Sequence, residues 1–285
     1  MFDQTQKRKI YRYINVLLYC NNKVLHTVNG LSKTIIDSYV NDTYKLMDKV
    51  RNVSALYVSN IGQYYLGIDN YSLAFEYHRN SLLIKAENLF EIINGYTTVG
   101  IEEFREICEL DYNRSGALIE KHKDLWCKVE AELLANDNSL YKRVRGYWAR
   151  VAVSYRTMGS DIQALIESGE SADSVIAFGC TCYQIAVKMF SAVFTQDMLR
   201  ERLITLTRAI EMHLHADSIS KEIEDDLYNW SEQATRIYLE NSHFIGKFEG
   251  EKLKDTMLHL HDRIGDKDLK VMIKSVSKAL EAIER

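Results

Sequence analysis

Apolar residues recur at three- and four-residue spacing along most of the chain, which is the spacing of one face of an α-helix. Alternation of apolar and polar residues, the pattern of a half-buried strand, is not sustained anywhere. The pattern predicts helices at 4–28, 31–48, 52–66, 70–94, 101–135, 140–158, 161–168, 174–194, 198–214, 217–240, 249–264 and 267–284. We therefore expect an all-α fold.

Short polar or glycine-containing segments separate these helices. The cluster Asn136–Ser139 favours a helix start, because Asn, Asp and Ser side chains accept hydrogen bonds from free backbone amides. Gly159 is expected to end the helix that begins near 140. No Pro/Ser-rich or charged linker marks a boundary, so we expect a single helical domain over 1–285.

The composition agrees with this helical pattern. None of the 285 residues is proline, whereas an average chain has about 5%, and this fits long helices joined by short turns. A net charge of −4 argues against a general nucleic-acid binder. No run of about 18 apolar residues and no signal-peptide core is present, so we expect no membrane partner. The five cysteines match no zinc or disulfide framework, which favours reduced thiols in the cytoplasm.

A basic cluster at 142–150 is the first candidate site. Arg143 and Arg150 are seven residues apart and therefore share one helical face, as do His78 and Lys85 on an earlier helix. Two such faces brought together would form a phosphate socket, because guanidinium donors match phosphate oxygens. The alternative interpretation is a solvated basic face.

An acidic cluster at 221–229 is the second candidate. Asp225 and Asn229 are four residues apart, and with Asp226 they could hold a divalent ion, as in class I isoprenoid-type magnesium-dependent enzymes. Such enzymes need a second acidic motif on a facing helix, and upstream only Asp69 stands alone. The simpler interpretation is the charged outer face of an amphipathic helix.

Other chemistry finds little support in the sequence. The pairs His213/His215, His259/His261 and Cys180/Cys182 are two residues apart, so their side chains point in nearly opposite directions on a helix. Neither a GxSxG motif nor a P-loop is present. We expect no metal, no cofactor and no enzymatic activity.

Several motifs together resemble the 14-3-3 family. The stretch Arg143–Ser154, RVRGYWARVAVS, is similar to that family's K-x-K-G-D-Y-x-R-Y-L-A-E. Other matches follow in the family's order, namely Asp42 and Met47, Lys85-Ala86, Ala216–Lys221 with Asp225-Asp226, and Met257–Ile264. The resemblance covers most of residues 40–264 at low identity.

This resemblance implies an antiparallel, cup-shaped bundle of about nine helices that binds phosphoserine or phosphothreonine peptides in an amphipathic groove. It assigns phosphate binding to Arg150 and Lys85, with Arg143 and His78 in support. The family's groove positions correspond to Val151, Leu206 and Arg263.

The chain also departs from the family pattern. Val151 stands where the family has a phosphate-binding tyrosine, and Tyr147 replaces an aspartate that orients the pocket. We therefore expect a weakened or altered phosphate pocket, and a helical scaffold without phosphate recognition is the alternative.

The two ends of the chain differ from the family as well. Residues 1–40 are expected to form a divergent N-terminal extension and dimerisation region, and 266–285 a C-terminal helix. The resemblance thus implies a cytoplasmic, homodimeric adaptor whose partners are phosphorylated proteins or peptides.

Overall fold

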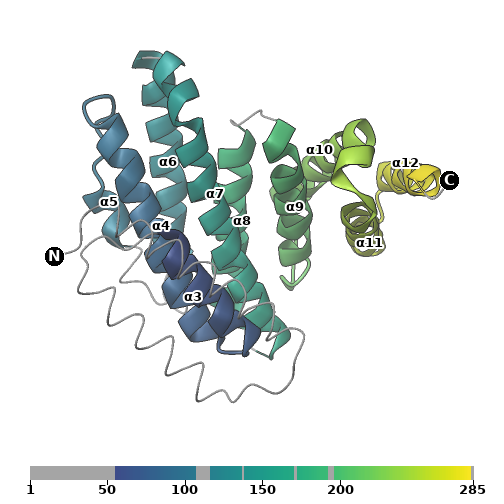
Figure 1. Ribbon diagram of the computed structural model, residues 1–285. Coiled ribbons are helices and arrows are strands. Elements are labelled where there is room, and N and C mark those ends of the chain that lie inside the picture. The colour runs from purple at the N-terminus through teal and green to yellow at the C-terminus, as the bar shows by residue number, and fades with distance from the viewer. Residues whose placement is uncertain (1–54, 107–115, 137, 170–171, 192–195, 284–285) are drawn as a thin grey trace. The chain divides into compact units, whose positions relative to one another are not determined.

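The computed structural model describes residues 55–106, 116–136, 138–169, 172–191 and 196–283. These residues form ten helices, α3 to α12, and no strand; one isolated bridge joins Asn94 and Thr97. The predicted all-α fold is confirmed for this part of the chain (Figure 1). The predicted helices at 4–28 and 31–48 and the dimerisation region at 1–40 lie outside the described residues.

Contacts divide the chain into two compact units. Unit 1 comprises Met1–Ile92 and Gly100–Glu109, and unit 2 comprises Ile93–Val99 and Leu110–Arg285. The expectation of a single domain therefore stays a prediction, and each unit is described by itself.

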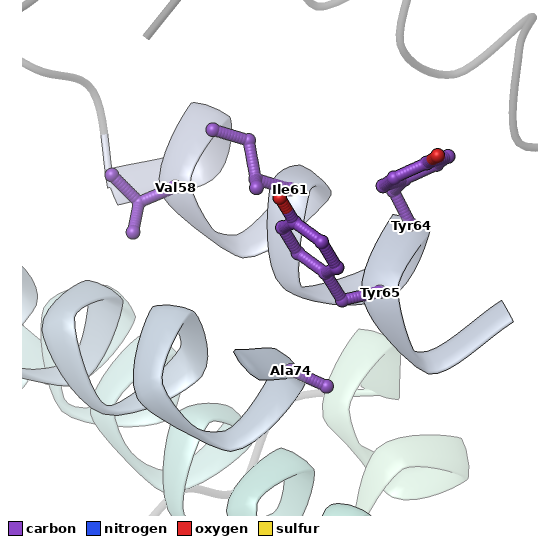
Figure 2. Close-up of a cluster of buried hydrophobic side chains, with 5 residues drawn as sticks. All are labelled: Val58, Ile61, Tyr64, Tyr65 and Ala74. Carbon is purple, nitrogen blue, oxygen red and sulfur yellow. The ribbon is translucent and has the colours of Figure 1, made fainter. Parts of the chain in front are cut away.

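The described helices of unit 1 are α3 (Ala55–Gly67), α4 (Tyr71–Ile93) and the short α5 (Glu102–Arg105). Figure 2 shows the apolar cluster that holds α3 against α4. Its buried members are Val58, Ile61, Tyr64, Tyr65 and Ala74. Burial of these side chains removes apolar surface from water, which is the main stabilising contribution to such a contact.

Unit 2 contains the other seven helices that the structure describes. They are α6 (Gly116–Asn136), α7 (Asn138–Glu167), α8 (Asp173–Ser191), α9 (Gln196–His213), α10 (Lys221–Ile245), α11 (Lys247–Ile264) and α12 (Lys267–Ile283). Consecutive helices pack together, and contacts also join α6 with α8, α7 with α9, α9 with α11 and α10 with α12. Contacts therefore connect α7 to α9 and α9 to α11, in addition to those between consecutive helices.

Large aromatic side chains form the core between α6, α7 and α8. The rings of Trp126 and Trp148 meet edge to face with centroids 5.3 Å apart. The indole N–H of Trp126 donates to the hydroxyl of Tyr155 at 2.8 Å, and that of Trp148 donates to the carbonyl of Met189 at 3.2 Å. The buried polar ends of these side chains are thus satisfied, which avoids the cost of an unpaired buried donor.

Helix α8 is the most apolar of the described helices in unit 2. By length and composition alone it could cross a membrane, and it is the one helix in the described part of the chain that could. Most of it is buried against its neighbours, with contacts to α6, α7 and α9. A central core helix of a globular unit has this composition for the same reason.

The predicted end of a helix near Gly159 is wrong, because α7 continues from Asn138 to Glu167. A Cβ atom at Gly159 would lie 2.7 Å from a ring carbon of Tyr183 on α8. The missing side chain at this position lets the two helices approach each other. The glycine is therefore a packing residue and not a helix terminator.

A carboxylate of α6 holds the turn that follows α4. The side chain of Glu132 accepts hydrogen bonds from the hydroxyl of Thr97 at 2.6 Å, and from the hydroxyl and backbone N–H of Thr98, each at 2.7 Å. These donors, that of Thr97 first, lower the pKa of Glu132 to about 2 because they stabilise its charged form. We call this arrangement the Glu132 clamp; it lies within unit 2.

A serine and two glycines mark the ends of helices α10 and α11. Ser220 caps α10 by accepting a hydrogen bond from the backbone N–H of Ile223 at 3.3 Å, so the helix begins at Lys221 and not at 217 as predicted. Gly246 (φ 94°) separates α10 from α11, and Gly265 (φ 74°) ends α11 in the left-handed conformation. Helix α12 follows and packs on both α10 and α11.

Candidate functional site

Exposed basic residues line part of α7, the helix in which sequence analysis places the main phosphate ligand. Lys142, Arg145 and Arg150 are all exposed. The guanidinium of Arg150 lies 5.5 Å from the ring centroid of Tyr147, at a distance typical of a cation–π contact. We call Lys142, Arg145 and Arg150 the basic face of α7. The side chain of Arg143, on the same helix, lies outside the described residues.

The basic face of α7 has no acidic partner in the described part of the chain, whereas three other arginines of unit 2 do. Arg156 pairs with Glu201 at 2.7 Å, Arg208 pairs with Glu211 at 2.8 Å, and Arg200 pairs with Glu249. The donors of Arg145 and Arg150 are thus left for water or for a ligand.

The two candidate ligands on α4 have different environments. His78 is 1% exposed, and its Nε2 lies 3.1 Å from the carbonyl oxygen of Ser59 and 3.2 Å from Nε2 of Gln63, both on α3. A Cβ at Gly62 would meet the His78 ring at 2.5 Å, so the ring fills the space that this glycine leaves. His78 is therefore a packing residue between α3 and α4. Lys85 is half-buried.

The predicted phosphate socket needs residues from both units. His78 and Lys85 belong to unit 1, whereas Arg143 and Arg150 belong to unit 2. Their convergence stays a prediction.

The three predicted groove residues occupy two kinds of environment. Val151 on α7 and Leu206 on α9 are both 0% exposed and form part of the core, so a peptide cannot reach them in this conformation. Arg263 on α11 is exposed and lines a pocket.

That pocket lies between α7, α9 and α11 and has a volume of about 390 Å³. It is lined by Gln163, Glu167, Arg208, Glu211, Leu214, His215, Lys252, His259 and Arg263. Five of these nine residues carry a basic side chain, so we call it the basic pocket. Of these nine residues, only Arg263 was predicted to lie at a binding position, as a residue of the peptide groove. The spacing of Lys252, His259 and Arg263, which places them on one face of α11, is the signal that could have indicated the others.

The acidic cluster of α10 lies on an outer face of the helix. Asp225 is exposed and pairs with Lys221 at 3.2 Å, and Glu224 pairs with the same lysine at 3.3 Å. Within the described residues no group of three His, Cys, Asp or Glu side chains is arranged to hold a metal ion. Nothing in this geometry favours the magnesium-dependent enzyme that the cluster suggested.

The paired cysteines and His213 contribute to packing. Burial raises the pKa of the Cys180 thiol to about 12 and that of Cys182 well above its usual value, which keeps both thiols protonated and poorly nucleophilic. The ring of His213 meets Trp230 edge to face, and its Nδ1 lies 2.8 Å from the carbonyl oxygen of Ala209. These residues belong to the core of unit 2.

Comparisons with protein families, with curated proteins and with solved structures each find no match to this chain. The similarity to the 14-3-3 family therefore rests on the sequence motifs alone.

Proposed function

We propose that this protein is a phosphopeptide-binding adaptor and that Arg150 is its main phosphate ligand. The observation that carries the proposal is the basic face of α7, whose three exposed cations have no carboxylate partner among the described residues. Two other arginines of unit 2, Arg200 and Arg208, are each more than a third exposed and pair with glutamates.

The environment of Arg150 suits a phosphate group. The central carbon of its guanidinium lies 5.5 Å from the ring centroid of Tyr147, and no carboxylate among the described residues pairs with its N–H groups. A planar fork of donors binds two phosphate oxygens at once, and such charge-assisted bonds are about twice as strong as neutral ones. A phosphorylated side chain supplies these oxygens together with a charge of about −1.5 to −2 near neutral pH.

Two further features of the proposal come from the 14-3-3 resemblance. Arg150 occupies the position of that family's phosphate-binding arginine, and the same resemblance implies a cytoplasmic homodimer that pairs through residues 1–40. Light scattering of the full chain and of a chain that lacks residues 1–40 tests the second feature. A dimer that survives the truncation would contradict it.

Fluorescence polarisation with phosphoserine peptides and their unphosphorylated counterparts tests the proposal. We expect the phosphorylated peptides to bind preferentially and Arg150→Ala to weaken that binding about tenfold or more, as expected for the loss of a charge-assisted pair. Arg236→Ala is the matched control, because Arg236 is also exposed and lies on α10 of the same unit. Equal affinity for both kinds of peptide would refute phosphate recognition, and equal losses in the two variants would refute the role of Arg150.

A further inference from the structure

The basic side chains of the basic pocket come from α9, from the turn that follows α9, and from α11. Arg208 lies on α9, His215 directly follows that helix, and Lys252, His259 and Arg263 lie on α11. The α11 residues flank the buried stripe of that helix, which includes Leu253, Met257 and Leu260. Packing of this stripe against the core thus directs three basic residues to the same side of α11.

Some of these cations already have partners inside the pocket. Arg208 pairs with Glu211 at 2.8 Å, and Glu211 also accepts a hydrogen bond from the hydroxyl of Thr256 at 3.0 Å. The guanidinium of Arg263 donates to the backbone carbonyls of Leu214, Ala216 and Asp217 just after α9, where helix carbonyls need donors. Arg208 and Arg263 are therefore held in fixed positions at the wall of the pocket.

The other cationic groups are less committed. Lys252 lies 3.6 Å from Glu211, beyond a good hydrogen-bond distance, and 44% of its side chain is exposed. In the described part of the chain the rings of His215 and His259 make no hydrogen bond. The ammonium of Lys252 and the two rings thus line the same pocket without a close partner, beside two arginines that add positive charge.

We propose that the basic pocket binds a phosphate group, as the monoester or the free ion. Three permanent cations, Arg208, Lys252 and Arg263, exceed the two carboxylates Glu167 and Glu211. One anionic ligand would balance this excess. Phosphate has several acceptor oxygens and can therefore bind donors that approach from different directions. The basic residues of α9 and α11 provide such donors.

The volume agrees with a small ligand. Pockets for small molecules span about 300–1,000 Å³, and the basic pocket, at about 390 Å³, lies near the lower end of that range. Phosphate with a short attached group fills such a space.

This site is separate from the basic face of α7. It contains no member of that face, and it rests on the geometry of α9 and α11, not on the family resemblance. The peptide assay with Arg150→Ala and the experiment below report on different residues, so one proposal can fail while the other stands.

Nuclear magnetic resonance of the histidine rings in the full chain tests the proposal, with inorganic phosphate as the probe. The chain has eight histidines, and we expect the signals of His215 and His259 to shift saturably, each assigned by its loss in the variant His215→Ala or His259→Ala. Lys252→Ala should raise the half-saturating phosphate concentration about tenfold, because it removes one charge-assisted bond.

Lys254→Ala is the matched control, since it removes the same charge from α11 two residues away, on the other side of the helix. It should leave the half-saturating concentration unchanged within about twofold. The absence of saturable shifts, or equal effects of Lys252→Ala and Lys254→Ala, would overturn the proposal.

A second titration with a phosphoserine peptide distinguishes the sources of the phosphate. Half-saturation at a lower concentration than inorganic phosphate would assign the pocket to a phosphorylated chain. Half-saturation at an equal or higher concentration would assign it to free phosphate.

Discussion

Helix α7 contains two glycines that provide a direct test of its packing against α8. A Cβ at Gly146 would have nothing within 4 Å, whereas a Cβ at Gly159 would lie 2.7, 2.8 and 3.0 Å from three ring carbons of Tyr183. Both residues lie within the helix. The substitutions Gly146→Ala and Gly159→Ala therefore make the same chemical change in two different surroundings.

The magnitudes follow from two opposing contributions. Replacing glycine by alanine in a helix interior stabilises by about 0.8–1.0 kcal/mol through helix propensity. At Gly146 this gain should appear in full. At Gly159 the extra methyl must displace the Tyr183 ring, and overpacking of this kind costs about 1–3 kcal/mol. Because the propensity contribution cancels, the free energies of unfolding of the two variants should differ by about 1–3 kcal/mol.

Urea denaturation followed by far-ultraviolet circular dichroism measures this difference. The same pair of substitutions in a Tyr183→Leu background supplies the control, because the smaller side chain removes the ring that the methyl would meet. In that background the difference between the two alanine variants should shrink. Equal stabilisation by Gly146→Ala and Gly159→Ala in the unaltered protein would refute the close approach of α7 and α8.

Two pH-dependent predictions follow from the buried and clamped side chains. Glu132→Gln should lower the free energy of unfolding by about 1 kcal/mol. This is less than a buried charged hydrogen bond would contribute, because solvent around the clamp screens the carboxylate. This loss of stability should be complete above about pH 4.3, the ordinary pKa of glutamate. It should vanish as the pH falls through the folded-state pKa of about 2. An equal loss at pH 7 and at the acid end of a urea-denaturation series would contradict the prediction. Burial lowers the pKa of His122 to about 4, below about 6.5 in an unfolded chain, so the unfolded state takes up a proton first and stability should fall between these values as the solution is acidified. His122→Gln should flatten that part of the stability profile, and an unchanged slope would contradict the assignment.

Periodicity predicted most of the helical elements because most long helices that the structure describes bury an apolar stripe. The stripe of α11, with Leu253, Met257 and Leu260, is readable from spacing alone. Gly159 was misread for a physical reason. Its role depends on Tyr183, which lies on the next helix. The spacing of apolar residues around Gly159 does not indicate which helix packs against it.

The candidate sites were predictable only in part. Arg150 is exposed, as a surface arginine in a basic cluster is expected to be, and its role as a phosphate ligand stays a prediction. The burial of Val151 and Leu206 was not foreseen from the motif comparison. The basic pocket was missed because its residues come from α7, α9 and α11, and their separate stripes meet only after the helices have packed.

The Glu132 clamp also bears on how this chain can be divided into fragments. The chain leaves unit 1 between Ile92 and Ile93 and re-enters it between Val99 and Gly100, so the clamped turn interrupts unit 1 in sequence while it belongs to unit 2 by its contacts. No single cut yields both units intact. A fragment of 110–285 would expose the carboxylate of Glu132 without Thr97 and Thr98, and a fragment that ends at Glu109 would carry an unanchored loop. During synthesis, unit 1 and the segment 93–99 are made before α6. Thr97 and Thr98 can therefore form their hydrogen bonds only after Glu132 has been added to the chain.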